Sequence, residues 1–160
     1  MVLNRHKRFL YYDCTNYYFE IEEADDFRKY GHSKENRPNP IVQMGLFMDA
    51  DEIPLTFSLF NGNENEQPSM KPLEKKILSD FGMTKFIVCT DTGLSSTSNR
   101  VFNNTPNRKF VTTQPIKKLK GHLKDYCLDE DGWHLIADKT EYKLSELDEI
   151  ENYEKTFYKD

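Results

Sequence analysis

Long apolar runs are missing from this 160-residue chain, and no stretch approaches the roughly 18 residues that a membrane span requires. The start, MVLNRHKRFLYYD, is basic but lacks the apolar core of a secretory signal. Cysteine is scarce, and the three thiols, Cys14, Cys89 and Cys127, include no CxxC pair. An odd number of widely spaced cysteines is typical of free thiols in a reducing compartment. We therefore expect a soluble, cytoplasmic protein with no membrane contact, no disulfide framework and no zinc site.

Positive charge is also in short supply. Lys and Arg number 22 against 27 Asp and Glu, which gives a net charge of −5. Free-standing nucleic-acid binders are normally basic, so this balance counts weakly against that class of protein. The length suits one domain, and a chain of this size buries about two-thirds of its unfolded surface when it folds.

Aromatic residues, by contrast, are plentiful at 13%, and they gather in short runs that are typical of strands. The runs predict strands over 9–14, 17–21, 41–48, 53–60, 86–90 and 109–113. Thr15 and Asn16 form either a tight turn between the first two runs or the middle of one long strand. The run 86–90 is apolar throughout, which predicts burial on both faces.

Helical patterns follow the first strands. Apolar residues recur at helical spacing over 68–81, and Gly82 is placed to end that helix. A Ser/Thr-rich stretch after residue 91 predicts a short helix capped by Ser95 or Ser96. Beyond Pro115 a basic amphipathic helix is predicted over 116–126, followed by an acidic segment. Antiparallel strands first and helix-linked strands afterwards indicate an α/β fold with a mixed sheet.

Two carboxylates each follow an apolar strand, Asp13 after Phe-Leu-Tyr-Tyr and Asp91 after Phe-Ile-Val-Cys-Thr. Ligand sites in α/β sheets gather at the carboxyl ends of strands, so these side chains converge if their strands are neighbours. A pair of carboxylates suits Mg²⁺ or Mn²⁺, which takes its other ligands from water and phosphate oxygens. The alternative is that each aspartate starts a turn or caps a helix, which are common roles for Asp at such positions.

Five sequence blocks in order add a resemblance to a known family. They are Asp13-Cys14-Thr15 with the aromatics and Glu20 that follow, Tyr30–Pro38 (YGHSKENRP), Gln43–Leu46 (QMGL), Ile53-Pro54-Leu55 with Phe60–Asn63 (FNGN), and Asp91–Ser96 (DTGLSS). Together they resemble the catalytic blocks of insertion-sequence DDE transposases. Asn61 stands where that family has Pro, and Thr90 where it has Ala. The resemblance covers residues 11–96 and fades after about Thr113.

The resemblance implies an RNase H-like fold and metal-dependent cleavage and transfer of DNA strands. The first three strands of such a sheet are antiparallel, and the later parallel strands are linked by helices. Asp13 would lie on the first strand and Asp91 just after the fourth, as catalytic residues and as ligands of two Mg²⁺ or Mn²⁺ ions. The implied partner is DNA at transposon ends, with a possible homo-oligomer and no nucleotide cofactor.

A third acidic residue of that family, a Glu within a Tyr/Arg/Glu/Lys helix pattern, has no match. The C-terminal region has several glutamates without that spacing, namely Glu141, Glu146, Glu149, Glu151 and Glu154. We therefore expect residues 1–115 to be a partial transposase core and 116–160 the start of an inserted subdomain. In that interpretation the chain is a fragment with little activity by itself. The alternative is a catalytically inactive RNase H-like remnant that binds DNA or full-length transposase.

Basic residues supply the candidate DNA contacts. Lys34 and Arg37 lie in a loop beside the predicted metal site, where they contact phosphates or remain solvated. Lys117 and Lys118 belong to the predicted basic helix, which either follows a DNA backbone or presents a solvated face.

Overall fold

The computed structural model of the protein describes residues 8–136 and 140–160. The chain divides into two compact units, residues 1–114 and residues 115–160, and each is described by itself. Within the described residues, no helix is long and apolar enough to cross a membrane.

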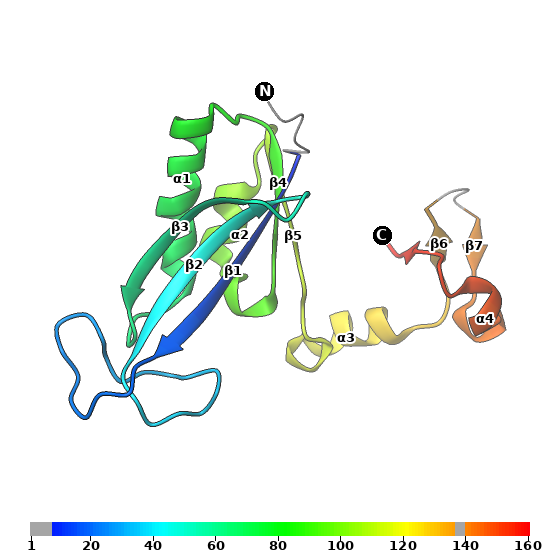
Figure 1. Cartoon of the computed structure of the whole chain (residues 1–160). Helices are drawn as coiled ribbons and strands as arrows, with labels where there is room; N and C mark the ends of the chain where they lie inside the picture. Colours follow the sequence, from blue (N-terminus) through cyan, green and yellow to red (C-terminus); the bar gives the residue numbers. More distant parts are fainter. Residues whose placement is uncertain (1–7, 137–139) are drawn as a thin grey trace. The chain divides into compact units, whose positions relative to one another are not determined.

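The first unit is a five-stranded mixed sheet with two helices. Its elements are β1 (Phe9–Tyr18), β2 (Ile41–Asp49), β3 (Pro54–Asn61), α1 (Met70–Phe81), β4 (Phe86–Thr90), α2 (Thr97–Asn103) and β5 (Arg108–Thr112), with 3-10 turns η1 (Gln67–Ser69) and η2 (Thr92–Leu94). The strand order is β3-β2-β1-β4-β5, in which β1, β2 and β3 are antiparallel and β4 and β5 run parallel to β1 (Figure 1). The predicted α/β class and mixed sheet are therefore confirmed.

β1 is one long strand rather than two strands joined by a turn. Its pairing with β2 continues without a break from Leu10 opposite Asp49 to Tyr18 opposite Ile41. The uninterrupted ladder satisfies the backbone of Thr15 and Asn16, which leaves no need for a turn there.

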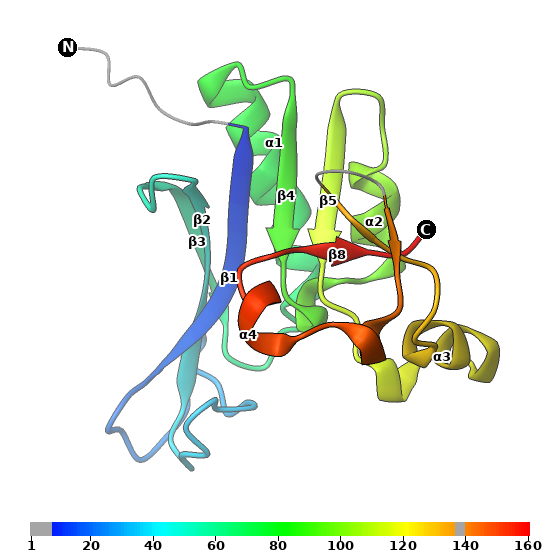
Figure 2. The same cartoon turned by 90° about the vertical axis from the view of Figure 1, so that its right-hand side faces the viewer.

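Both helices of the first unit pack on the same face of the sheet (Figure 2). The core on that face joins Leu10 and Tyr12 of β1 to Leu73 and Ile77 of α1. The opposite face carries large apolar side chains that stay more than a third exposed, including Phe9, Tyr11, Phe57, Leu59 and Val111.

This one-sided packing corrects the expectation for β4. Phe86 and Val88 are buried, but Ile87 and Cys89 on the other face are only partly buried. The apolar run over 86–90 predicted that both faces of β4 are buried, but the helices cover only one face of the sheet, so only that face of β4 is fully buried. All three cysteines are free thiols, of which Cys14 is buried and Cys89 and Cys127 are partly so.

The helix boundaries follow their local signals in the first unit. Gly82 ends α1 in the left-handed region, at φ 60°, where a residue with a side chain is strained. Ser96 caps α2 by accepting a hydrogen bond from the backbone N–H of Asn99 over 3.1 Å. Both predictions are confirmed.

The second unit departs from its predicted continuous helix over 116–126. A 3-10 turn, η3 (Ile116–Lys118), is followed by extended backbone at Leu119 and Lys120 before α3 begins (Gly121–Leu128). The later elements are β6 (Trp133–Leu135), β7 (Glu141–Tyr142), a 3-10 turn η4 (Leu144–Glu146), α4 (Glu149–Asn152) and β8 (Phe157–Tyr158), with the strands in the order β7-β6-β8.

Lys159 helps to hold the second unit together. Its largely buried side chain lies over the Tyr126 ring, with the ammonium 4.7 Å from the ring centroid, and 3.5 Å from Asp129 Oδ2. The hydrogen bond that the Asp131 backbone N–H donates, together with the Lys159 ammonium, lowers the pKa of the Asp129 carboxyl.

A buried polar cluster joins α1, α2 and β5. Glu74 and Asn103 have no exposed surface, and Asn103 Nδ2 donates to Glu74 Oε2 over 2.9 Å. Arg108 Nε lies 3.9 Å from Glu74 Oε1. In the part of the chain that the structure describes, Glu74 Oε1, Asn103 Oδ1 and Arg108 Nε have no hydrogen-bond partner. Burial raises the pKa of Glu74, and the hydrogen bond from Asn103 and the charge of Arg108 oppose this only in part.

We expect Glu74→Gln to be at least as stable as the parent protein at about pH 8, because glutamine keeps the acceptor for Asn103 and removes a buried charge. A carboxyl whose folded pKa is raised contributes stability below its unfolded pKa of about 4.3 and loses it as pH rises through the folded pKa. The gain in stability from Glu74→Gln should therefore be largest at about pH 8 and shrink as the pH falls toward about 4. Thermal unfolding of both proteins across this pH range measures the change.

The exposed Glu23→Gln substitution is the matched control and should show no such pH trend. If Glu74→Gln were destabilising by the same amount at every pH, the carboxylate would be charged throughout and paired with Arg108.

Candidate functional site

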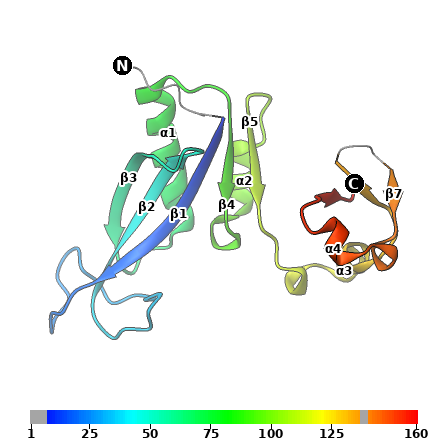
Figure 3. The same ribbon diagram turned by 45° about the vertical axis from the view of Figure 1, so that its right-hand side comes forward.

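β1 and β4 are neighbouring parallel strands (Figure 3). Asp13, in the middle of β1, and Asp91, directly after β4, lie at the edge where the pairing of these two strands ends. β1 and β4 pair with Tyr12 opposite Thr90, so the two aspartates are the next residues along their chains. Asp91 keeps an extended backbone, at φ −79° and ψ 178°, so the alternation of side chains continues through it. Both aspartates are exposed, and both belong to the face of the sheet opposite α1 and α2.

Each aspartate uses one carboxylate oxygen within the fold. Asp13 Oδ1 accepts the backbone N–H of Cys14 over 2.7 Å, and Asp91 Oδ1 accepts the backbone N–H of Leu94 over 3.2 Å. Among the described residues, Oδ2 of each aspartate has no hydrogen-bond partner. Two oriented carboxylates with a free oxygen each are hard donors of the type that Mg²⁺ and Mn²⁺ prefer, so the donor set fits such an ion.

Lys34 is the basic residue that the fold brings to Asp13. Its ammonium donates to the backbone carbonyl of Cys14 and lies 3.9 Å from Asp13 Oδ1. Both side chains are about half exposed or more, at 48% for Lys34 and 69% for Asp13, so the ion pair adds little stability. The main effect of Lys34 is therefore on the local charge beside the carboxylates.

Glu66 is a third carboxylate at this edge, and the sequence interpretation did not single it out. Burial raises the pKa of Glu66, the negative charges of Asp13 and Asp91 raise it further, and the charge of Lys34 opposes this. The three carboxylates therefore act on one another electrostatically. No sequence signal identified Glu66. The block FNGN, which belongs to the family resemblance, ends three residues before Glu66, and the loop around Glu66 has no periodic pattern.

A chain of hydroxyl groups ties Glu66 to β1. Ser69 Oγ donates to the backbone carbonyl of Glu66 over 2.5 Å, and the Tyr12 hydroxyl is 2.5 Å from Ser69 Oγ. The Cys14 thiol donates in turn to the Tyr12 hydroxyl over 3.4 Å. Burial raises the pKa of Tyr12 and of Cys14, so both stay neutral. Cys14 is thus a buried thiol that is hydrogen-bonded within the core.

Two loops, Gly31–Lys34 and Gly62–Glu66, line a pocket of about 520 Å³ near Asp13. Gln43 is buried and holds the second loop, because its Nε2 donates to the carbonyls of Gly62 and Glu64 over 2.9 and 2.7 Å. His32, Lys34 and Glu66 line the same pocket. The space next to Asp13 is therefore polar and carries charges of both signs.

Arg37, the other predicted DNA contact of the first unit, has partners other than the aspartates. Arg37 Nε lies 3.3 Å from Glu35 Oε2, and its guanidinium stacks over the Tyr18 ring at 4.4 Å. Lys117 and Lys118 belong to the second unit, where they lie on the 3-10 turn η3, before α3 begins, and not on the predicted helix.

Among residues 8–136 and 140–160, no group of three or more His, Cys, Asp or Glu side chains is arranged to hold a metal ion. Asp13, Asp91 and Glu66 therefore interact by charge without forming a three-ligand group. In comparisons with known proteins, no family model, no curated protein and no solved structure matches the chain.

We expect Gly62→Ala to destabilise the protein by about 1–3 kcal/mol, the usual cost of overpacking. A Cβ at position 62 would meet the carbonyl oxygens of Ile41 and Lys29 at 2.2 and 2.5 Å, and backbone atoms cannot turn aside as side chains do. Thermal denaturation measures the loss.

Gly93→Ala is the control in the same unit, since its Cβ would lie 3.4 Å from the nearest atom, an ordinary contact. Equal melting temperatures for the two variants would show that the loops do not approach as closely as described.

Proposed function

We propose that the first unit is the catalytic core of an insertion-sequence DDE transposase with an RNase H-like fold. Asp13 and Asp91 bind Mg²⁺ or Mn²⁺, and the substrate is DNA. The observation that supports this proposal is the register of β1 and β4, in which Tyr12 lies opposite Thr90, so that Asp13 and Asp91 both follow the last residues of this parallel pairing.

The sheet supports the same assignment. Its first three strands are antiparallel, and its later strands are parallel and linked by helices, which is the arrangement expected of an RNase H-like core. Asp13 lies within the first strand and Asp91 directly after the fourth, at the positions that the sequence blocks imply.

The residues of the chain prepare the site for a phosphodiester. The backbone N–H groups of Cys14 and Leu94 each hold one aspartate oxygen, so the free oxygens are oriented before a ligand arrives. Lys34 provides positive charge beside Asp13 for a phosphate oxygen. Asp13 and Asp91 would hold the metal ions, which would supply positive charge for the attacking and the leaving oxygen of a phosphodiester.

We expect Mn²⁺ to bind the protein and Asp13→Asn or Asp91→Asn to weaken that binding by at least about ten-fold, because each removes a ligand charge. Asparagine still accepts the Cys14 or Leu94 N–H, so the local fold is kept. Electron paramagnetic resonance of free Mn²⁺ measures binding directly.

Asp26→Asn removes the same charge from an exposed loop position and is the control. If Asp13→Asn and Asp91→Asn left Mn²⁺ binding unchanged, as Asp26→Asn should, the proposed metal site would be wrong.

We expect little cleavage of supercoiled DNA by this chain alone with Mg²⁺ or Mn²⁺, because no residue matches the third acidic position of the family pattern. Gel analysis of nicked product, with Asp91→Asn as the reference for background, measures it. Fast cleavage that Asp91→Asn abolishes would contradict this expectation and point to another carboxylate in the site. DNA binding with neither metal binding nor cleavage would favour the inactive, DNA-binding remnant instead.

A further inference from the structure

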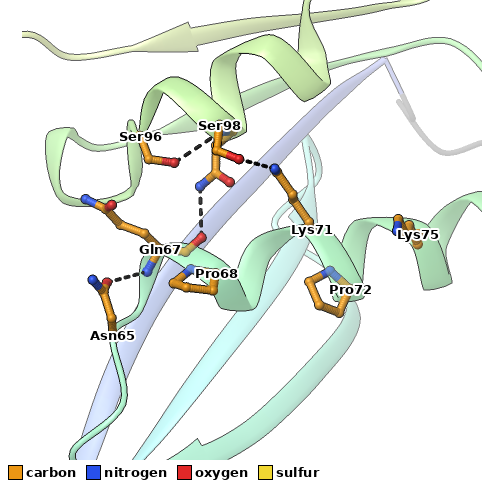
Figure 4. A pocket seen from close by; sticks show the side chains of 9 residues that line it. Asn65, Gln67, Pro68, Lys71, Pro72, Lys75, Ser96 and Ser98 are labelled. Carbon is orange, nitrogen blue, oxygen red and sulfur yellow. Dashed lines mark hydrogen bonds between the residues drawn. The ribbon is translucent and has the colours of Figure 1, made fainter.

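A second pocket, of about 450 Å³, lies between the first turns of α1 and the start of α2 (Figure 4). Pro68 and Pro72 supply its apolar surface. Its polar lining comes from Asn65, Gln67, Lys71, Lys75, Ser96, Ser98 and Asn99. It includes neither Asp13 nor Asp91, so it is separate from the carboxylate site.

The charge of this pocket is opposite to that of the whole chain. Lys71 and Lys75 line it without any Asp or Glu, although the net charge of the protein is −5. The two lysines are four residues apart on α1, so they share one helix face and repel each other. In the described residues, neither lysine has an ion-pair partner. The charge of Lys71 acts on the buried Glu74 carboxyl, but no carboxylate lines the pocket itself, so an anion there would relieve the repulsion between the two lysines.

Two donors of the pocket, Lys71 and Ser98, are already held in place. Lys71 reaches from α1 to donate to Ser98 Oγ on α2, and its ammonium lies 5.6 Å from the centroid of the Phe102 ring. Because Ser98 Oγ accepts this bond, its own O–H is free to turn toward a ligand. An ammonium and a hydroxyl fixed in advance lose little freedom when they bind an anion.

Hydrogen bonds from side chains to backbone carbonyls also fix the wall of the pocket. Asn99 Nδ2 donates to the carbonyls of Gln67 and Leu94 over 3.0 and 2.9 Å, and Gln67 Nε2 donates to the carbonyl of Gly93 over 3.0 Å. The loop that begins at Asp91 and ends at Ser96 therefore borders both this pocket and the carboxylate site.

We propose that Lys71, Lys75 and Ser98 bind a phosphate group of a DNA strand. A phosphodiester offers only acceptor oxygens and a negative charge, which matches a lining of ammonium and hydroxyl donors. The choice of DNA as the source of the phosphate rests on the proposed function, whereas the preference for phosphate rests on the pocket. A strand held here is anchored at the loop that also carries Asp91.

The test compares Lys75→Gln with Lys76→Gln by fluorescence anisotropy of a labelled DNA duplex, in EDTA and over a range of salt concentrations. Both lysines are exposed neighbours on α1, but only Lys75 lines the pocket. Lys75→Gln should weaken binding about two- to five-fold. It should also reduce the slope of log affinity against log salt by about 0.9, the value for one lost phosphate contact. Lys76→Gln should leave the slope unchanged, and equal effects of the two variants would overturn the proposal.

Competition with inorganic phosphate separates the sources of the ligand. DNA should be displaced only at phosphate concentrations far above those of the duplex, because one phosphate lacks the other backbone contacts. Phosphate that binds tightly through Lys75, with no effect of Lys75→Gln on DNA, would overturn DNA as the source.

Mn²⁺ binding distinguishes failure of this proposal from failure of the metal site. The assay in EDTA needs no metal, so a loss of DNA affinity in Lys75→Gln supports the pocket even if Asp13 and Asp91 bind no ion. The converse result is Mn²⁺ binding that depends on the aspartates while Lys75→Gln leaves DNA affinity unchanged. That result would overturn the proposed phosphate-binding pocket and leave the metal site supported.

Discussion

The parallel pairing of β1 with β4 is the constraint on which the candidate site depends. With Tyr12 opposite Thr90, the residues that follow them reach the same edge of the sheet on the same face. A slip of one residue would turn one aspartate toward the helices, where its charge would be buried. Buried Leu10 and Val88, paired on the helix face, hold the register, because a slip would also expose them.

Charge at this edge is divided between two adjoining places. Asp13, Asp91 and Glu66 make one side acidic, and their mutual repulsion is eased by Lys34. Across the loop 91–96 the second pocket is lined with lysines and no carboxylate. A protein with a net charge of −5 can therefore still offer a place for a polyanion, because the local field near a surface depends on the nearest charges and salt screens the rest.

Local sequence signals identified most of the elements of the first unit. The helix over Met70–Phe81 and its end at Gly82 follow from apolar periodicity and from the left-handed backbone that glycine tolerates. The same logic failed over 116–126, where the amphipathic pattern continues but the backbone is extended at Leu119 and Lys120. The spacing of apolar residues shows which face of a helix could be buried, but it does not show where the backbone hydrogen bonds of that helix are interrupted.

By itself the sequence identified Asp13 and Asp91 as the candidate site residues, because each follows an apolar run that is visible along the chain. Only the tertiary structure decided which other groups join them. Lys34 reaches Asp13 while Arg37, three residues later in the same loop, turns to Glu35 and Tyr18. Glu66 comes to this edge through hydrogen bonds that link Tyr12 to Ser69. Contacts between residues more than fifty positions apart are set by the packing of α1 on the sheet, and no local pattern encodes them.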